Sequence, residues 1–279
     1  MCTAKFYVGL CWIMLTAAAL RNTAAQDPLS LKLHDYVHRA PDPSDKFPAS
    51  WYPADQGGEK NETPGPITGL PYTAVTVDTS RSKSTNGEVN ENVTRSPQAR
   101  DSFGRTRSEF RIGAMDLPDG SSVVIYTVLV SDPVSHCTFS WSEARPDPPD
   151  NSHIANVTCA SRTLKYDDGL TVEKIIEQIP LGQTKHGDTD TLVERLPPLH
   201  IDGITVERQR LTKTYKGQHG TPIATVGENW YSPDLKEVIR LGDSNSDMLL
   251  TEIHRVEPDP KLFYPPAGYR IQVKQPAPR

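Results

Sequence analysis

The sequence has few apolar residues for its length, and it is especially poor in aromatic ones. Its 279 residues are 36% hydrophobic and 7% aromatic, with six phenylalanines against 25 prolines. Globular domains average about 45–50% apolar residues, in a count that includes glycine. Because so little apolar surface is available, we expect part of the chain to lie outside any hydrophobic core.

The chain also lacks an excess of basic residues. Its formal net charge is −5 and its pI is about 5.9. A protein that binds nucleic acid normally has a basic face or a pI above about 9. The composition therefore predicts no nucleic-acid partner.

Long apolar runs are missing everywhere except at the N-terminus. Residues 1–25 combine Lys5, a fifteen-residue apolar run from Phe6 to Leu20, and the small residues Thr23-Ala24-Ala25. This is the pattern of a secretory signal peptide, and the run is shorter than the roughly 20 residues that a membrane-spanning helix needs. We expect cleavage before Gln26, a periplasmic or secreted protein, and no transmembrane span after cleavage. An uncleaved N-terminal anchor is the alternative.

Cysteine is scarce as well, and two of the four cysteines lie in the expected signal peptide. The other two, Cys137 and Cys159, are 22 residues apart and enclose the turn-like segment ARPDPPDNS. In an exported protein an even number of cysteines favours a disulfide. We predict a hairpin of two short strands stapled by this bridge, which contributes about 3 kcal/mol in the chain-entropy account. Two buried free thiols are the alternative.

The remaining sequence divides into a lead-in and a folded part. Residues 26–70 hold seven prolines and almost no periodic apolar pattern, so we expect a disordered Pro-rich segment. Residues 71–275 show period-2 alternation, which predicts a single antiparallel β domain. One short helix is expected over 171–182, and the polar stretch 183–196 is expected to be a loop. The expected strands are 71–79, 86–95, 104–112, 121–130, 135–142, 153–161, 204–214, 223–231, 235–241, 247–256 and 268–274.

Three stretches carry a family resemblance: Arg100–Glu109 (RDSFGRTRSE), Glu228–Lys236 (ENWYSPDLK), and Arg255–Phe263 (RVEPDPKLF) with the PAGY that follows shortly after. Their order and spacing resemble a family of uncharacterised secreted bacterial proteins, over roughly residues 65–272. The C-terminal part is also similar, more distantly, to the lipoprotein-carrier (LolA/RseB-like) superfamily. That resemblance implies a mainly β fold in which a large curved antiparallel sheet, a half-barrel, wraps one short helix and encloses an apolar cavity. The chain departs from its own group at the two cysteines and at a shortened connection over 242–246.

No motif in the sequence indicates a catalytic site or a metal site. Gly242-Asp243-Ser244 lies between two expected strands, and no G-x-S-x-G elbow is present, so a hairpin turn is predicted there. His34 and His38 are four residues apart but lack further ligands nearby in sequence, and His136 and His153 lack a third ligand. We expect a protein that is not an enzyme and that holds no cofactor and no metal.

Charged residues alternate along two of the expected strands. Arg105, Arg107 and Glu109 share one strand face, and Arg208 and Arg210 share another. Such residues form either a binding patch or a ladder of cross-strand ion pairs, each worth roughly 0.2–1 kcal/mol. The pattern favours the ladder.

Aromatic residues gather late in the chain, and a half-closed sheet would line a ligand cavity with some of them. A plain core between sheet and helix is the other interpretation of the same residues. The leading hypothesis is an exported non-enzymatic protein that binds a hydrophobic ligand, a lipid, a lipoprotein or an acyl chain, between sheet and helix. The alternative is a cell-envelope protein–protein interaction or sensing module with a filled core. The candidate cavity residues are Trp141, Trp230, Tyr231, Phe263 and Tyr269.

Overall fold

The fold was described from a computed structural model, which describes residues 47, 49–52, 60–117, 119–147, 153–160, 165–167, 180–216 and 221–274. Several predictions fall outside the described residues. They concern the signal peptide, His34 and His38, and residues 171–179 of the expected helix. No helix among the described residues is long and apolar enough to cross a membrane.

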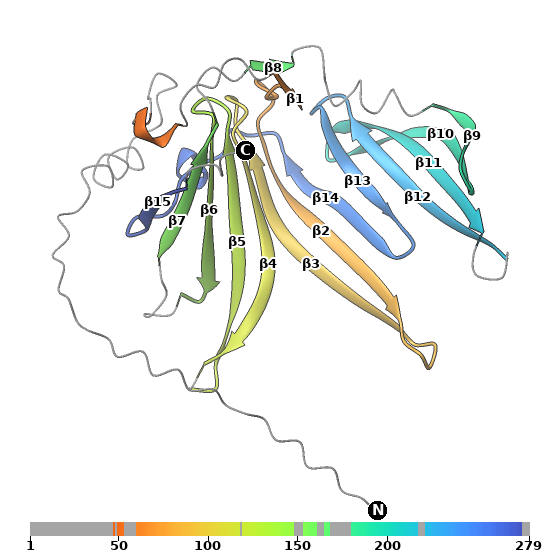
Figure 1. Cartoon of the computed structure of the whole chain (residues 1–279), viewed down its shortest axis with the longest axis horizontal. Coiled ribbons are helices and arrows are strands. Elements are labelled where there is room, and N and C mark those ends of the chain that lie inside the picture. The colour runs from red at the N-terminus through yellow and green to blue at the C-terminus, as the bar shows by residue number, and fades with distance from the viewer. Residues whose placement is uncertain are drawn as a thin grey trace, which may run out of the picture.

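One large, curved and unclosed sheet dominates the molecule (Figure 1). Its strand order is β15-β7-β6-β5-β4-β3-β2-β14-β13-β12-β11-β10-β9. The mainly β, antiparallel architecture predicted from the period-2 pattern is therefore confirmed. The strands are β2 (Tyr72–Lys83), β3 (Val89–Arg100), β4 (Thr106–Asp116), β5 (Ser122–Asp132), β6 (Cys137–Arg145), β7 (Ile154–Cys159), β9 (Gly182–His186), β10 (Thr189–Ile201), β11 (Ile204–Lys216), β12 (Pro222–Ser232), β13 (Glu237–Asp243), β14 (Ser246–His254) and β15 (Arg270–Val273).

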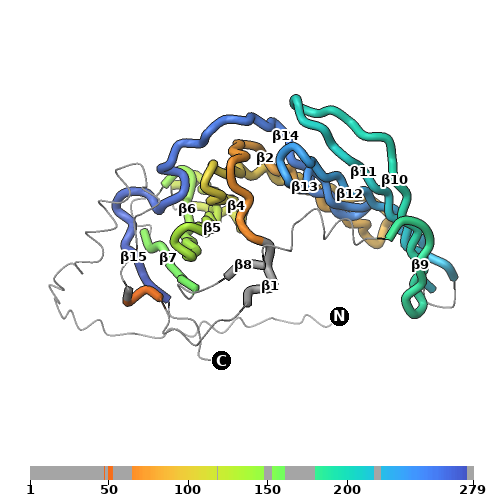
Figure 2. The backbone as a smooth tube through the Cα atoms, turned by 90° about the horizontal axis from the view of Figure 1, so that it is seen from above, coloured from red at the N-terminus to blue at the C-terminus, as the bar shows by residue number. Residues whose placement is uncertain are grey.

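Two meanders of six strands each make up most of this sheet. In β2–β7, which we call the first meander, every strand pairs with the next strand along the chain. The same holds for β9–β14, the second meander, and the two meet where β14 pairs with β2. Seen from above, the sheet follows a bent path with β7 and β9 far apart (Figure 2). The C-terminal strand β15 departs from the antiparallel pattern, because it pairs with β7 in parallel.

The polar stretch 183–196, expected to be a loop, is instead most of the hairpin β9–β10, and that expectation is wrong. Gly187, with φ 60°, begins the two-residue turn between the paired residues His186 and Thr189. β9 is the last strand of the sheet, so it needs little apolar side-chain surface. Two consecutive prolines sit where the β10–β11 register shifts, and an irregularity of this kind is where a strand tolerates proline.

Two hydrophobic clusters hold the sheet together. The first lies on β5–β7 and contains Val128, Val130, Phe139 and Trp141; the short helix η3 (Pro260–Phe263) adds Phe263 to it. The second joins β2, β11, β13 and β14 through buried residues, with Leu235 from the turn before β13. Its members are Tyr72, Ala74, Ile204, Val206, Leu235, Ile239, Leu250 and Ile253.

Part of the expected Pro-rich lead-in belongs to the first cluster. Phe47 and Trp51, the latter in helix η1 (Ala49–Trp51), are buried. Phe47 stacks on Trp51 at 4.9 Å and meets Phe139 edge-on at 5.6 Å. The β1 strand (Lys60–Pro64) also pairs in parallel with β8 (Lys165–Asp167). The expectation of a disordered lead-in therefore does not hold for Phe47 and Trp51, because isolated aromatic residues without periodicity can still dock onto a sheet.

The predicted pairing of Cys137 with Cys159 is confirmed. β6 and β7 form an antiparallel pair in which the two cysteines lie directly opposite each other, with their sulfur atoms at bonding distance. Along β6 the alternating residues Cys137, Phe139 and Trp141 are buried, as the period-2 pattern requires.

Candidate functional site

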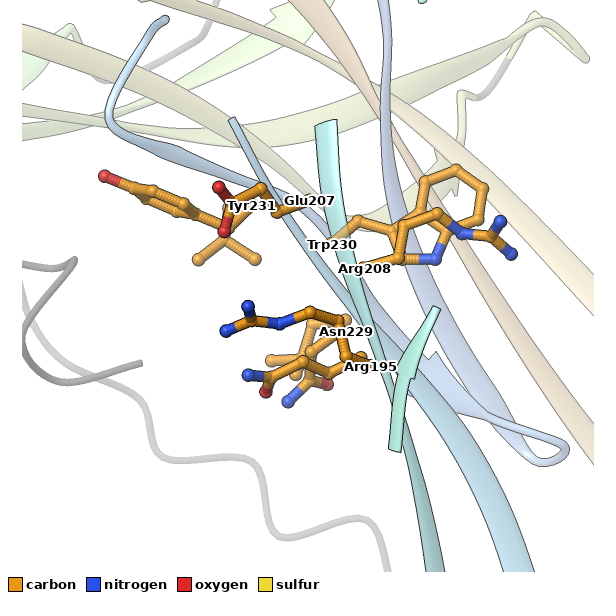
Figure 3. A pocket seen from close by; sticks show the side chains of 9 residues that line it. Arg195, Glu207, Arg208, Asn229, Trp230 and Tyr231 are labelled. Atoms are coloured by element: carbon orange, nitrogen blue, oxygen red, sulfur yellow. The ribbon is translucent and has the colours of Figure 1, made fainter. Parts of the chain in front are cut away.

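A pocket of about 140 Å³ opens on one face of β10–β13 in the second meander (Figure 3). Its wall follows two rows of cross-strand partners, whose side chains point to the same face of a sheet. One row runs Arg195, Gln209, Asn229 and Leu241, and the other runs Glu207, Tyr231 and Val238. Arg208 and Trp230 also border the pocket, although their side chains point to the other face. The pocket thus combines an apolar part with several polar groups.

The polar groups of the pocket come from three adjacent strands. Arg195 lies on β10, Glu207 and Gln209 on β11, and Asn229 on β12. The Oε1 atom of Gln209 is buried and has no hydrogen-bond partner among the described residues. A buried acceptor without a partner is costly, about 1–3 kcal/mol, so this atom marks a place where a donor would be favourable.

The opposite face of the same strands carries a charged cluster around Trp230. Figure 3 shows the side chains of Arg208 and Trp230 pointing away from those of Glu207 and Tyr231, because successive residues of a strand alternate between faces. Arg208 and Arg240, from the strands on either side, lie with their guanidinium carbons 5.0 and 4.9 Å from the centre of the Trp230 ring. These are cation–π distances.

Glu228 links the members of this cluster. It accepts a hydrogen bond from Trp230 Nε1 at 2.8 Å, one from Arg208 at 3.0 Å and one from Arg210 at 3.3 Å. Burial by itself would raise the pKa of Glu228, but these hydrogen bonds together lower the pKa below its ordinary value. Asp247 accepts from Arg240 Nε at 2.8 Å on the same face. We call Arg208, Arg210, Glu228, Trp230, Arg240 and Asp247 the arginine–tryptophan face.

A closely similar cluster lies in the first meander. Trp141 Nε1 donates to Glu143 at 2.7 Å, and the Arg107 guanidinium carbon lies 5.3 Å from the Trp141 ring centre. Arg107 also pairs with Glu109 at 2.6 Å. Here the cluster is covered, because Arg107 Nη1 donates to the backbone oxygen of Leu262 in η3 at 2.9 Å.

The charged residues of β4 lie beneath the segment around η3. Arg105, Arg107 and Glu109 alternate on one strand face as predicted, and all three are buried. Arg105 pairs with Asp101 at 2.5 Å and donates to the Tyr264 hydroxyl at 3.0 Å. Cross-strand ion pairs of the predicted kind are present, because Arg107 and Glu109 reach Glu143 and Arg145 of β6 at 3.4 and 2.8 Å. Arg208 and Arg210 also form cross-strand pairs, with Glu228.

The five aromatic residues expected to line one cavity lie in two places. Trp141 and Phe263 are buried in the first cluster, and Tyr269 packs against it with its ring 6.5 Å from that of Trp141. Trp230 and Tyr231 are in the second meander, on opposite faces of β12. Burial, with help from Glu143 and Asp147, raises the pKa of Tyr269 to about 12.

Gly242-Asp243-Ser244 belongs to the tight connection between β13 and β14. Asp243 Oδ1 accepts from the backbone N–H groups of Asn245 and Ser246 at 2.7 and 3.1 Å. His136 lies in the turn between β5 and β6, and His153 contacts Asp147 at 2.9 Å. Among the described residues no group of three or more His, Cys, Asp or Glu side chains gathers as a metal site would require.

Sequence reasoning did not identify the polar residues of the pocket, namely Arg195, Glu207, Gln209 and Asn229. Two features of the sequence do indicate the hairpin that carries them: an Asp-Gly pair at 202–203 between apolar residues, typical of a hairpin turn, and alternation on both sides of that pair. Because 183–196 was expected to be a loop, Arg195 was not placed on a strand beside β11. The register between β10 and β11 is what brings it beside Gln209.

No family model matches the chain, and none of the curated proteins compared with it matches. The resemblance to secreted bacterial proteins and to lipoprotein carriers thus stays an expectation.

Proposed function

We propose that this protein is an exported, non-enzymatic binding protein that holds the apolar end of an amphipathic ligand, such as an acyl chain, in the pocket on β10–β13. The observation that carries the proposal is the convergence of Tyr231, Val238 and Leu241 with several polar groups in one concave site. Ligand sites in proteins are commonly apolar with a few placed polar groups.

The size of the pocket limits what it can take. Ligand pockets usually measure about 300–1,000 Å³, whereas a cavity of about 150 Å³ suits a molecule the size of benzene. The pocket of about 140 Å³ is therefore suited to one end of an acyl chain and not to a whole lipid. At about 0.8 kcal/mol per buried CH₂, six carbons contribute about 5 kcal/mol before the costs of association.

Polar groups beside the pocket supply the rest of the recognition in this proposal. The Arg195 guanidinium suits a carboxylate or phosphate head group. A donor on the ligand that approached Gln209 would satisfy its buried Oε1 atom. This binding mode differs from burial between sheet and helix, because it uses the open face of the second meander.

Binding of decanoic acid to the purified protein, followed by isothermal titration calorimetry with the acid as the probe, tests this proposal. Leu241→Asp places a charge against the acyl chain and is expected to weaken binding by about tenfold, since a charge without a partner is costly in an apolar site. Val226→Asp is the matched control, because Val226 is similarly exposed (48% against 53%) on the other face of the sheet. No probe uptake, together with no lipid in an organic extract of the protein, would overturn the proposal, as would equal losses in both variants.

A second candidate is the protein–protein interaction module, and the packing of the first cluster favours it. Phe47, Trp51, Phe139 and Tyr264 fill the face of the first meander with the chain's own side chains. In this candidate, binding falls to the second meander, where the charged side chains of the arginine–tryptophan face are 17–43% exposed.

A further inference from the structure

The two meanders repeat one structural plan. Counted along the chain, β5 and β6 occupy the same places in the first meander as β12 and β13 in the second. Both pairs are joined by a turn of four residues with proline at its first position, Pro133 or Pro233. Both turns end in a residue with left-handed backbone, His136 (φ 56°) and Lys236 (φ 52°), a conformation that is uncommon for these residue types.

One arginine lies at the same position in each meander. Arg107 on β4 lies opposite Val130, which is two residues before the end of β5. Arg208 on β11 lies opposite Trp230, which is two residues before the end of β12. Each arginine lies over a tryptophan ring and near the glutamate to which that tryptophan donates. The tryptophan and glutamate lie on β6 in the first meander, but on β12, the counterpart of β5, in the second. The likeness of the two clusters is therefore chemical, and only the arginine occupies the same position in both.

In the first meander a segment of the chain covers the cluster. Leu262 accepts a hydrogen bond from Arg107, and Phe263 is fully buried with its ring centre 5.0 Å from the Arg105 guanidinium carbon. The segment Glu257–Pro266 has the sequence EPDPKLFYPP. The backbone carbonyl of Leu262 and the rings of Phe263 and Tyr264 are what the arginines of this surface contact.

No segment of the described chain plays this part in the second meander. Among the described residues, Arg208 donates to the backbone oxygen of Pro197 on the adjacent strand at 3.5 Å, and its buried Nε atom has no hydrogen-bond partner. The Arg208 side chain is 18% exposed against 8% for Arg107. Glu194, the cross-strand partner of Arg210, lies on the same face, so the three arginines there are balanced by three carboxylates.

We infer that the arginine–tryptophan face is the docking site for a polypeptide segment of a partner protein, one in which adjacent aliphatic and aromatic residues lie between prolines, as in the chain's own segment. The inference rests on the second candidate function. A backbone carbonyl of the segment accepts from Arg208, and its aromatic ring packs beside Trp230. Proline-rich segments lose little conformational entropy on binding, because they are already extended.

The chain's own segment supplies the probe. A fluorescein-labelled peptide EPDPKLFYPP is titrated with the mature protein, and binding is followed by fluorescence anisotropy. Trp230→Ala is expected to weaken binding by at least about tenfold, as for a tryptophan at the centre of an interface. A scrambled peptide is expected to bind weakly or not at all. Circular dichroism checks that the variant is folded.

A second variant keeps the test decisive if Trp230→Ala does not fold. Arg210→Glu changes a half-exposed side chain and is expected to weaken binding by about tenfold through charge reversal. Peptide binding that is absent at millimolar concentration, or unchanged in Arg210→Glu, overturns the inference. A concentration-dependent dimer that Arg210→Glu abolishes, without peptide binding, also overturns it and makes a second copy of the chain the occupant.

The design separates this inference from the ligand pocket. Leu241→Asp changes the opposite face, so it is expected to leave peptide binding unchanged while it weakens binding of the fatty acid. Peptide binding that survives in Arg210→Glu but fails in Leu241→Asp would assign the peptide to the pocket and contradict the docking site. Absence of peptide binding in the unmodified protein overturns the inference, while the ligand pocket is judged separately by fatty-acid binding.

Discussion

Two glutamates, Glu143 and Glu228, each accept a hydrogen bond from a tryptophan two residues away on the same strand. Residues two apart on a strand point to the same face, so the indole N–H reaches the carboxylate directly. Burial opposes ionisation of Glu143, but hydrogen bonds from Arg145 and Trp141 and the charge of Arg107 together lower its pKa below the ordinary value. The ionised form is thus favoured in the folded state.

The lowered pKa of Glu143 predicts how stability depends on pH. A carboxyl group with a lower pKa in the folded than in the unfolded state stabilises the protein above the unfolded pKa, about 4.3. This contribution is lost as the pH falls through the folded pKa. Denaturant unfolding should therefore show Glu143→Gln less stable than the unmodified protein at pH 7, with the difference shrinking toward pH 3.

An exposed glutamate provides the control for this measurement. Glu91, paired with Arg81 at the surface, is expected to change the free energy of unfolding by less than about 1 kcal/mol when replaced by glutamine. A Glu143→Gln deficit that is equally large at pH 7 and pH 3 would show that the effect comes from packing and not from ionisation.

Residues of this kind mark the boundary of what the sequence predicts. The alternation of Arg105, Arg107 and Glu109 on one face follows from strand periodicity alone. Their burial does not, because it depends on Leu262 and Tyr264, about 155 residues further along the chain. A surface ion pair and a buried one have the same local sequence, and only the tertiary contact distinguishes them.

Among the elements, the hairpin β6–β7 joins local sequence to distant packing. Cys137 and Cys159 occupy one cross-strand pair, and β15 adds to β7 in parallel on its outer side. The disulfide therefore fixes the strand on which the C-terminal segment docks. The cysteine spacing and the Pro-rich loop predicted this hairpin, because a covalent staple and a turn are both local signals.

Removal of the disulfide is expected to lower the free energy of unfolding by about 3 kcal/mol, the chain-entropy value for a loop of this size. Denaturant unfolding of the double variant Cys137→Ser and Cys159→Ser measures the change. Both cysteines of the unmodified protein should resist alkylation until a reductant is added. Rapid alkylation of the native protein without reductant would contradict the bridge.

The strands β9 and β10 show why the rest of the sheet was harder to predict. An edge strand buries little side-chain surface, so its sequence need not alternate between apolar and polar residues. The segment from Gly182 to His186 is accordingly polar throughout. Its only strong signals are turn residues, Gly187 and the Asp202-Gly203 pair. Because the pocket depends on β10, the candidate site could not be assembled without these turns.

At the scale of the whole molecule, the sheet is continuous only because the two meanders join through β2 and β14. Arg100 of β3 reinforces this junction. It is 1% exposed, donates to Glu237 at 3.1 Å and to the backbone oxygen of Leu235, and lies over the Tyr72 ring. Burial, partly offset by Arg100, raises the pKa of Glu237. One buried arginine thus connects residues from both meanders.

Loss of this arginine is expected to destabilise the junction. Arg100→Met removes the ion-pair partner of Glu237, which keeps its hydrogen bond from Tyr72, and leaves the carbonyl groups of Leu70 and Leu235 without this donor. The expected loss is about 3 kcal/mol, the lower end for breaking a buried ion pair, because about a quarter of the Glu237 side chain stays exposed. Denaturant unfolding measures the loss, and hydrogen exchange should show weaker protection in both β2 and β13.

Adding Glu237→Gln to Arg100→Met should recover part of the stability, because the unpaired charge is then removed. If Arg100→Met costs less than about 1 kcal/mol, or the double variant is no more stable than the single one, the two meanders are held together by the β2–β14 ladder and the second cluster alone.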